Sequence, residues 1–352
     1  MPDPSPASAI PAAFLHQASW CDRLGSPFTA TLLRALLPDL EAGAPLAAII
    51  GDWPGNPAAD LLPLRITGAL HALMLSNQAP ELTPLYPPNP VPDEATLRAT
   101  LPAVLLAHAD FIRAFIAAAP QTNEVARAAV LLGGFMQIAA ATRLPLRLLE
   151  IGASAGLNLL WDQFHYQLGT ASWGNAASPV RLAPSWHGNL PPLDAEVQVA
   201  SRAGCDLAPI NSADQADQLR LRAYVWPDQT ERLERLDGAL RLAAAAPPVV
   251  EQGNATDFLA SHLADLPAGE TTVIYHSIMW TYVAEADRAA ITALVQDAAR
   301  RATEATPVAW LRFELETPET NPALKLTLWP GATQHRLAVA SPHGASVEWL
   351  AD

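Results

Sequence analysis

Lysine is almost absent from this sequence, since Lys325 is the only one among 352 residues. A P-loop places lysine directly after its glycines to reach nucleotide phosphates, and no Gly-Lys-Ser/Thr occurs, so P-loop nucleotidases are excluded. A Schiff-base enzyme would have to use Lys325 itself. Lys plus Arg number 21 against 35 Asp plus Glu, a net charge of −14. That charge repels phosphate backbones and anionic headgroups, so we expect neither a nucleic-acid nor a membrane partner.

Cysteine is equally scarce, with Cys21 and Cys205 as the only thiols. Two thiols make no disulfide framework, and no Cys/His cluster has zinc spacing, so no metal is expected. Apolar stretches are interrupted well before the ~20 residues that a spanning helix needs, and Met1–Pro6 has no basic region. We therefore expect a cytoplasmic protein, and the sequence leaves its oligomeric state open.

The pattern of apolar residues changes near Pro145. Before it, helical spacing predominates, which predicts an all-helical N-terminal domain over residues 1–145, with Thr122 or Asn123 capping its last helix. After it, short apolar strands alternate with helices, which predicts a doubly wound, mainly parallel α/β sheet over residues 146–352. The predicted parallel strands are 146–151, 197–201, 249–251, 272–276 and 308–314, and 324–329 with 336–340 form a C-terminal antiparallel hairpin around Pro330-Gly331.

Two connections in the second half also carry predictions. Residues 217–246 are long enough for one crossover helix, and Trp226-Pro227-Asp228 resembles a helix start because proline suits the first helical position. Residues 165–195 are rich in Gly, Pro, Trp and Asn, which predicts a long irregular insertion.

The main motif is Glu150-Ile151-Gly152-Ala153-Ser154-Ala155-Gly156, at the carboxyl end of the first predicted strand. Gly152 permits a sharp turn, the small side chains after it allow close approach of a ligand, and Gly156 opens the next helix, whose free N–H groups attract negative charge. In a doubly wound sheet this is the edge where ligands bind. The alternative is a tight strand-to-helix connection without a ligand.

Three chemistries compete for this turn. A dinucleotide site requires G-x-G-x-x-G, which is absent because Ser154 holds the middle place. A serine hydrolase is suggested by G-x-S-x-G, with Ser154, Asp257 and His343 in the order of a triad. Such a hydrolase has several strands and an oxyanion loop before its nucleophile, whereas only helices are predicted here before the strand that leads to the serine. The third possibility depends on Glu150.

An acidic residue two places before Gly152, followed by small residues and Gly156, resembles motif I of the Rossmann-like S-adenosylmethionine-dependent methyltransferases. The order of predicted elements from about 145 to 352, with its terminal antiparallel hairpin, resembles that fold too. The resemblance implies a cofactor turn built from Glu150, Gly152, Ser154 and Gly156.

More specifically, four blocks resemble an uncharacterised bacterial family with a domain-of-unknown-function designation, number two-three-three-two. The resemblance covers nearly the whole chain, but the family has no assigned function. A methyltransferase-like fold does not by itself establish methyl transfer. The blocks are Leu149–Asn158, Gly204–Ile210, Trp226–Gln229 with Arg232, and His276–Tyr282.

The methyltransferase resemblance assigns further roles. It implies that Asp206 binds the ribose, although aspartate also favours turns, and that Asn254 meets adenine. Apart from the resemblance, Asp257 is expected to cap the following helix. On the substrate side it points to His276 as a proton acceptor and to Tyr282 and Glu314 beside it. A core histidine and solvated acids remain the alternatives.

The resulting expectation is S-adenosylmethionine-dependent methyl transfer to a small molecule, with the helical domain as a cap over the site. Two other functions stay open. One is a hydrolase with Ser154 as nucleophile, and the other is a non-catalytic ligand-binding protein on the same fold.

Overall fold

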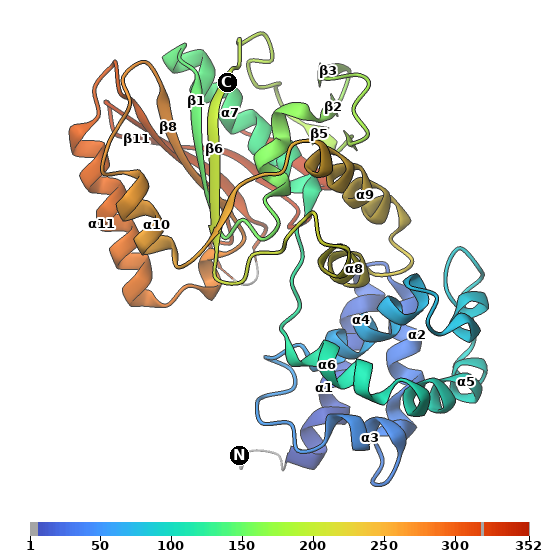
Figure 1. Ribbon diagram of the computed structural model, residues 1–352. Helices are drawn as coiled ribbons and strands as arrows, with labels where there is room; N and C mark the ends of the chain where they lie inside the picture. The colour runs from blue at the N-terminus through green and yellow to red at the C-terminus, as the bar shows by residue number, and fades with distance from the viewer. Residues whose placement is uncertain (1–5, 318–319, 352) are drawn as a thin grey trace. The chain divides into compact units, whose positions relative to one another are not determined.

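The computed structural model describes residues 6–317 and 320–351 (Figure 1). It divides into two compact units, of which the first contains the chain up to Thr122 together with Gln215–Leu233, and the second contains the remainder. The boundary therefore lies before residue 145, because the helix Ala128–Thr142 packs with the sheet. The predicted crossover helix over 217–246 is in fact two helices, and the first of them belongs to the helical unit.

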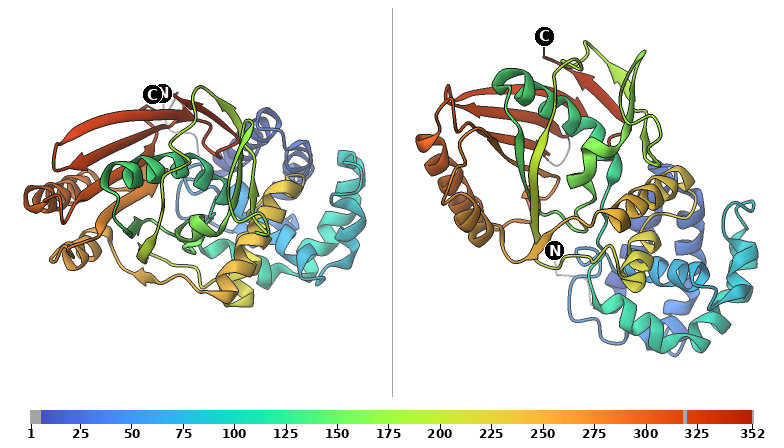
Figure 2. Two further views of the ribbon diagram at one scale, coloured as in Figure 1. Left: turned by 90° about the horizontal axis from the view of Figure 1, so that it is seen from above. Right: turned by 45° about the horizontal axis from the view of Figure 1, so that its top comes forward.

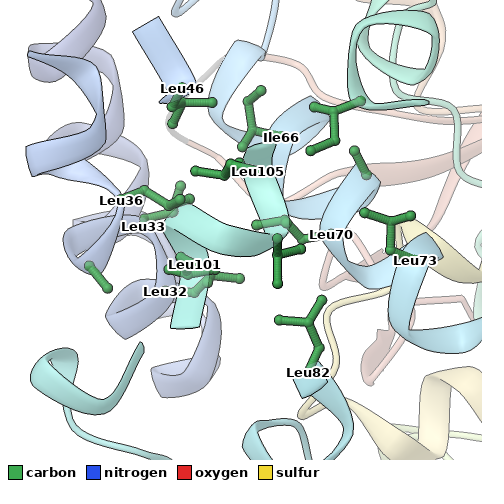
Figure 3. Packing of buried hydrophobic residues seen from close by; sticks show 14 of the residues in the cluster. Leu32, Leu33, Leu36, Leu46, Ile66, Leu70, Leu73, Leu82, Leu101 and Leu105 are labelled. Atoms are coloured by element: carbon green, nitrogen blue, oxygen red, sulfur yellow. The ribbon is translucent and has the colours of Figure 1, made fainter. Parts of the chain in front are cut away.

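The first unit is helical. Its core contains aliphatic and aromatic side chains from several helices, and Figure 3 shows leucine and isoleucine side chains of this cluster interdigitating. Burial of such side chains is what stabilises helices of this length, because isolated short helices are marginal in water. Its elements are α1 (Pro6–Arg23), α2 (Pro27–Ala35), η1 (Leu37–Leu40), α3 (Pro45–Ile50), α4 (Leu62–Leu75), η2 (Pro80–Leu85), α5 (Glu94–Ala107), α6 (Ala109–Ala117) and α8 (Gln215–Ala223), and α9 (Thr230–Ala245) begins in it.

The second unit is built on a nine-stranded sheet within the described residues, in the order β5-β12-β11-β10-β9-β8-β1-β6-β7. Strands β7, β6, β1, β8 and β9 are mutually parallel. The strands are β1 (Leu146–Ile151), β5 (Ser185–His187), β6 (Val199–Asp206), β7 (Val250–Gln252), β8 (Thr271–Ser277), β9 (Val308–Glu314), β10 (Ala323–Trp329), β11 (Thr333–Ala340) and β12 (Ser346–Trp349).

This arrangement confirms an α/β fold with a mainly parallel central sheet and a helical N-terminal region. The C-terminal strands are antiparallel, as expected, but they form a meander of β9, β10, β11 and β12 instead of a single added hairpin. Figure 2 shows these strands, in red, lying side by side. Strand β5 then pairs in parallel with β12 at the edge.

The insertion after β1 is more regular than its composition predicts. It contributes β5 and a separate small sheet of β2 (His165–Leu168), β3 (Ala171–Gly174) and β4 (Arg181–Leu182). The prediction of an irregular segment was wrong because aromatic side chains on these short strands pack together in spite of the turn residues. Tyr166 on β2 contacts Trp173 on β3, and Trp173 stacks on Trp161.

Helices cover both faces of the sheet. Leu149 and Ile274 pack on the side of α10 (Ala255–His262) and α11 (Glu285–Arg301), which Figure 1 shows together at one face. The other face receives α7 (Ala128–Thr142), where a Cβ on Gly134 would come within 2.3 Å of Leu311. Shorter 3-10 segments are η3 (Val125–Arg127), η4 (Leu157–Gln163) and η5 (Trp280–Tyr282).

One continuous helical stretch among the described residues, Val125–Thr142, is long and apolar enough to cross a membrane. This stretch is 72% buried inside the structure, where α7 contacts β9, β10 and β11. Burial against a sheet is the environment of a core helix, and its apolar composition follows from that position. Helices α5 and α6 are long and apolar enough to cross a membrane only when they are taken together, and the chain bends by 84° between them.

Candidate functional site

The turn after β1 adopts left-handed backbone at three positions, Gly152, Ser154 and Gly156, with φ of +69°, +55° and +70°. Such values suit glycine and strain serine, so the backbone strain of this turn is concentrated at Ser154. Gly152 is exposed, and a Cβ there would come 3.0 Å from Met279. The turn leads into η4, a 3-10 segment in place of the expected α-helix.

Asp206, at the carboxyl end of the adjacent strand β6, lies directly against this turn. Its Oδ2 accepts the Ser154 N–H at 2.9 Å, and its Oδ1 accepts the Ala208 N–H at 3.0 Å. Parallel pairing of β1 with β6 opposes Ile151 and Cys205, so the two strands end together. The structure therefore brings Asp206 and the glycine turn into contact across 52 positions of sequence.

Glu150 does not reach the surface of the turn. It is fully enclosed on the α7 face, where the Tyr275 hydroxyl donates to its Oε2 at 3.1 Å. Burial raises the pKa of this carboxyl from 4.5 to about 8, against the opposing effects of the Tyr275 hydrogen bond and the Arg127 charge. Glu150 thus lies beneath the turn and supports it from the core.

Asn254 caps α10. Its Oδ1 accepts the Asp257 N–H at 2.8 Å, and its amide donates to the Asp257 carboxylate at 2.8 Å. The prediction that Asp257 caps this helix was wrong, because the helix begins at Ala255 and Asn254 has the extended backbone of a cap. Both ends of the Asn254 amide are thereby engaged in local structure.

His276 and Glu314 meet at the ends of β8 and β9. His276 Nδ1 lies 2.7 Å from Glu314 Oε1, and the Trp310 indole N–H donates to His276 Nε2 at 3.3 Å. An indole only donates, so Nε2 must accept and the ring proton resides on Nδ1. Trp280 stacks on the ring with centroids 4.9 Å apart. His276 is completely buried.

Glu314 also holds the loop that follows β8, since it accepts the N–H groups of Met279 and Trp280 at 3.1 and 3.2 Å. Tyr282 stands apart from this cluster, because it is 84% exposed. The structure thus joins His276 to Glu314 and leaves Tyr282 at the surface.

A polar segment before α7 completes this edge of the sheet. Asn123 Oδ1 accepts the Leu157 N–H at 3.0 Å, so it closes the 3-10 segment after the glycine turn and does not cap α7 as predicted. The carbonyl of Glu124 accepts from the Asn158 amide at 3.3 Å, and Arg127 donates to the Ser277 carbonyl at 3.0 Å. The only sequence signal for a role of this segment in the site was the polar run 121–124, which is also typical of an ordinary helix start.

Two buried polar atoms at this edge have no hydrogen-bond partner in the described part of the chain, Ser154 Oγ and Asn158 Oδ1. Ser154 is 6% exposed and Asn158 2%. Because orphaned buried polar atoms are uncommon, they mark the turn as a place where a ligand or a water completes the hydrogen bonding.

The three residues of the hydrolase hypothesis do not come together. Asp257 is engaged with Asn254, and His343 Nδ1 lies 3.5 Å from Glu124, not from Asp257. Ser154 Oγ makes no hydrogen bond to a histidine within the described residues.

A surface cavity of the sheet unit lies at its opposite edge, near the amino end of β1. Its walls include Arg143, Pro145 and the segment 194–198. The polar residues gathered at the carboxyl ends of β1, β6, β8 and β9 are separate from this cavity.

The comparison with known proteins gives one family. No curated protein matches the chain. The model of a family described as "Uncharacterized protein conserved in bacteria (DUF2332)" matches residues 11–349. Since the match extends over both units and every site residue described above, the chain belongs to the DUF2332 family of uncharacterized bacterial proteins.

Proposed function

We propose that this protein binds S-adenosylmethionine at the carboxyl edge of its parallel strands and transfers the methyl group to a small molecule. The order of the five parallel strands supports a Rossmann-like site. They lie in the order β7-β6-β1-β8-β9, so the chain leaves β1 toward β6 and later returns to its other side with β8. Ligands of open α/β sheets bind where the winding reverses, at the carboxyl ends of β1 and β8.

The observation that carries the proposal is the contact between Asp206 and the Ser154 N–H. It places a carboxylate from the neighbouring strand beside a turn of small residues. A carboxylate accepts about four hydrogen bonds, so Asp206 suits a pair of neighbouring hydroxyls such as those of ribose. The chemistry of this donor and acceptor set fits a nucleoside better than it fits a pyrophosphate, because the Asp206 carboxylate lies against the turn.

The remaining residues fit the cofactor unevenly. Gly152 offers exposed backbone for close approach, Met279 supplies an apolar wall beside it, and the orphaned Ser154 hydroxyl is available within the turn. Asn254 is engaged in capping α10, so it is a weak candidate for holding adenine. The cofactor would supply an activated methyl group, and the chain would supply position and exclusion of water.

On the substrate side, Glu314 acts as a positioning residue. Through its hydrogen bonds it fixes His276 and the loop from Met279 to Trp280, which borders Gly152. The Trp310 indole holds the second nitrogen of His276, so we assign His276 to the support of this loop. Tyr282, at the surface of the same loop, remains a candidate for contact with the methyl acceptor.

Isothermal titration calorimetry tests this proposal with S-adenosylmethionine and S-adenosylhomocysteine. We expect micromolar binding by the wild-type chain and a loss of about 10- to 100-fold in Asp206→Ala, since hydrogen bonds to a charged group contribute about 1.5 to 3 kcal/mol. Gly152→Val should also lose binding, because its Cβ would meet Met279 at 3.0 Å in a left-handed backbone conformation.

The matched control is Asp265→Ala, which removes an exposed aspartate elsewhere in the same unit and should bind as the wild type does. Folding of each variant is checked by circular dichroism. Absence of heat from well-folded wild-type protein with both ligands would contradict the proposal.

A further inference from the structure

The carboxylate of Glu124 faces an imidazole that the sequence did not associate with it. The Glu124 side chain is 5% exposed, and its Oε2 lies 3.5 Å from His343 Nδ1. Its Oε1 accepts the Ala126 N–H at 3.2 Å, and its backbone carbonyl is bound by Asn158. The carboxylate is therefore held by the backbone of its own segment, and the backbone of Glu124 is in turn held by Asn158, beyond the glycine turn.

His343 is held just as firmly through its backbone. It lies between β11 and β12, in a tight turn where the Gly344 N–H donates to the Ser341 carbonyl at 2.9 Å. Arg127 Nε donates to the Pro342 carbonyl at 3.1 Å. Gly344 has φ of +68°, and a Cβ there would lie 2.3 Å from the Ala126 carbonyl oxygen, so only glycine allows the turn to approach so closely. The His343 side chain nevertheless stays 47% exposed.

The position of this pair on the sheet is set by the same contacts. Arg127 joins the His343 turn to the Ser277 carbonyl at the end of β8, and Asn123 joins the segment to Leu157 beyond the end of β1. The pair is thus tied to the carboxyl ends of the two strands between which the winding reverses. Groups at this edge are the ones that a bound ligand meets.

We propose that Glu124 and His343 form a carboxylate–imidazole pair that removes a proton from a small molecule bound at this edge. A carboxylate oxygen 3.5 Å from Nδ1 favours the tautomer with its proton on Nδ1, which leaves Nε2 as the acceptor. His343 suits this role better than His276, because His276 is fully buried with both ring nitrogens engaged. The substrate class is a small molecule with a hydroxyl, amine or thiol as its reacting group.

Joined to the proposed function, on which this step rests, the pair defines the methyl acceptor. The oxygen, nitrogen or sulfur of the acceptor forms a bond to the methyl carbon while the bond from that carbon to the sulfonium sulfur breaks. His343 Nε2 takes the proton that the acceptor loses, and the sulfur keeps the electron pair as a neutral thioether. Glu124 then faces an imidazolium, whose charge it stabilises.

The test uses 4-nitrophenyl acetate, a small activated ester whose hydrolysis an accessible imidazole catalyses. Water supplies the oxygen, the acyl carbon–oxygen bond breaks, and 4-nitrophenol and acetate are released. We expect the protein-dependent rate to fall at least about tenfold in His343→Gln and several-fold in Glu124→Gln, within the range of general-base effects. His335→Gln, at an exposed histidine on the neighbouring strand β11, is the control and should keep the wild-type rate.

A second measurement protects the result against misfolding of a variant. Diethyl pyrocarbonate followed by peptide mass spectrometry on the wild-type chain should modify His343 and spare His276. A wild-type ester rate in His343→Gln, or an unmodified His343, would overturn the proposal. Covalent labelling of Ser154 by a fluorophosphonate would also overturn it, since the ester chemistry would then belong to the serine. The ester assay contains no methyl donor, so its failure and a failure of cofactor binding are separate results.

Discussion

Glu150→Gln should become more stable than the wild-type chain as the pH rises from about 5 to about 8. Burial raises the pKa of Glu150 to about 8 in the folded protein, whereas the unfolded chain has the ordinary value of 4.5. The folded state therefore keeps a proton that the unfolded state releases, and stability falls with rising pH over this interval. Glutamine cannot ionise, so the variant avoids this loss.

The expected size of the effect follows from the same linkage. Each pKa unit corresponds to about 1.4 kcal/mol, so the difference in free energy of unfolding between variant and wild type should grow by about 3 kcal/mol across the interval. Urea unfolding at several pH values measures it. Other titrating groups are common to both proteins and cancel in the difference.

The matched control is Glu304→Gln, because Glu304 is exposed and should show no such growth. If the difference in free energy of unfolding between Glu150→Gln and wild type stayed constant across the interval, Glu150 would have its ordinary pKa in the folded protein. In that case its carboxylate would have to be solvated, contrary to its burial beside Tyr275.

Asp228→Ala should destabilise the helical unit by about 3 kcal/mol. Asp228 accepts the Phe28 N–H at 3.0 Å and the hydroxyl hydrogen of Ser26, at the start of α2. Ser26 occupies the cap position of α2, but its side chain makes no capping hydrogen bond. The carboxylate of Asp228, 200 residues away in sequence, accepts the Phe28 N–H in its place. Removing it would leave the buried Phe28 N–H unsatisfied and remove a negative charge from a helix N-terminus, while the Ser26 hydroxyl keeps Thr29 as a partner.

Hydrogen exchange measured by mass spectrometry should locate this effect in α2. We expect peptides over Pro27–Ala35 to exchange faster in Asp228→Ala and to an intermediate extent in Asp228→Asn, which keeps one acceptor. Asp52→Ala, at an exposed aspartate of the same unit, is the control. Unchanged exchange in α2 would show that the carboxylate contributes nothing to its cap.

The wrong assignments of Asp228 and Asn123 share one physical cause. Asp228 was assigned to the start of a local helix because proline and acids suit that position, whereas it caps α2 from a distant part of the chain. Asn123 was assigned to the cap of α7 and instead binds Leu157. A polar side chain has several compatible uses in sequence, and only the three-dimensional fold selects between a near partner and a distant one.

The sequence by itself determined the elements whose signals are local. Helical periodicity predicted the N-terminal helices, short apolar runs predicted the five parallel strands, and the glycines of residues 152–156 predicted the turn, because each depends on neighbours a few residues away. The strand predicted over 197–201 stops short of Asp206. In the structure β6 extends to Asp206, and parallel pairing with β1 puts that end beside the turn.

The tertiary structure alone decided which side chains meet. It buried Glu150 under the turn and gave both ring nitrogens of His276 a partner, while Tyr282 stayed exposed. It also placed His343 beside Glu124 and not beside Asp257. These outcomes depend on strand order, register and the path of loops between elements. Such contacts span many residues, and no pattern within a short window of sequence encodes them.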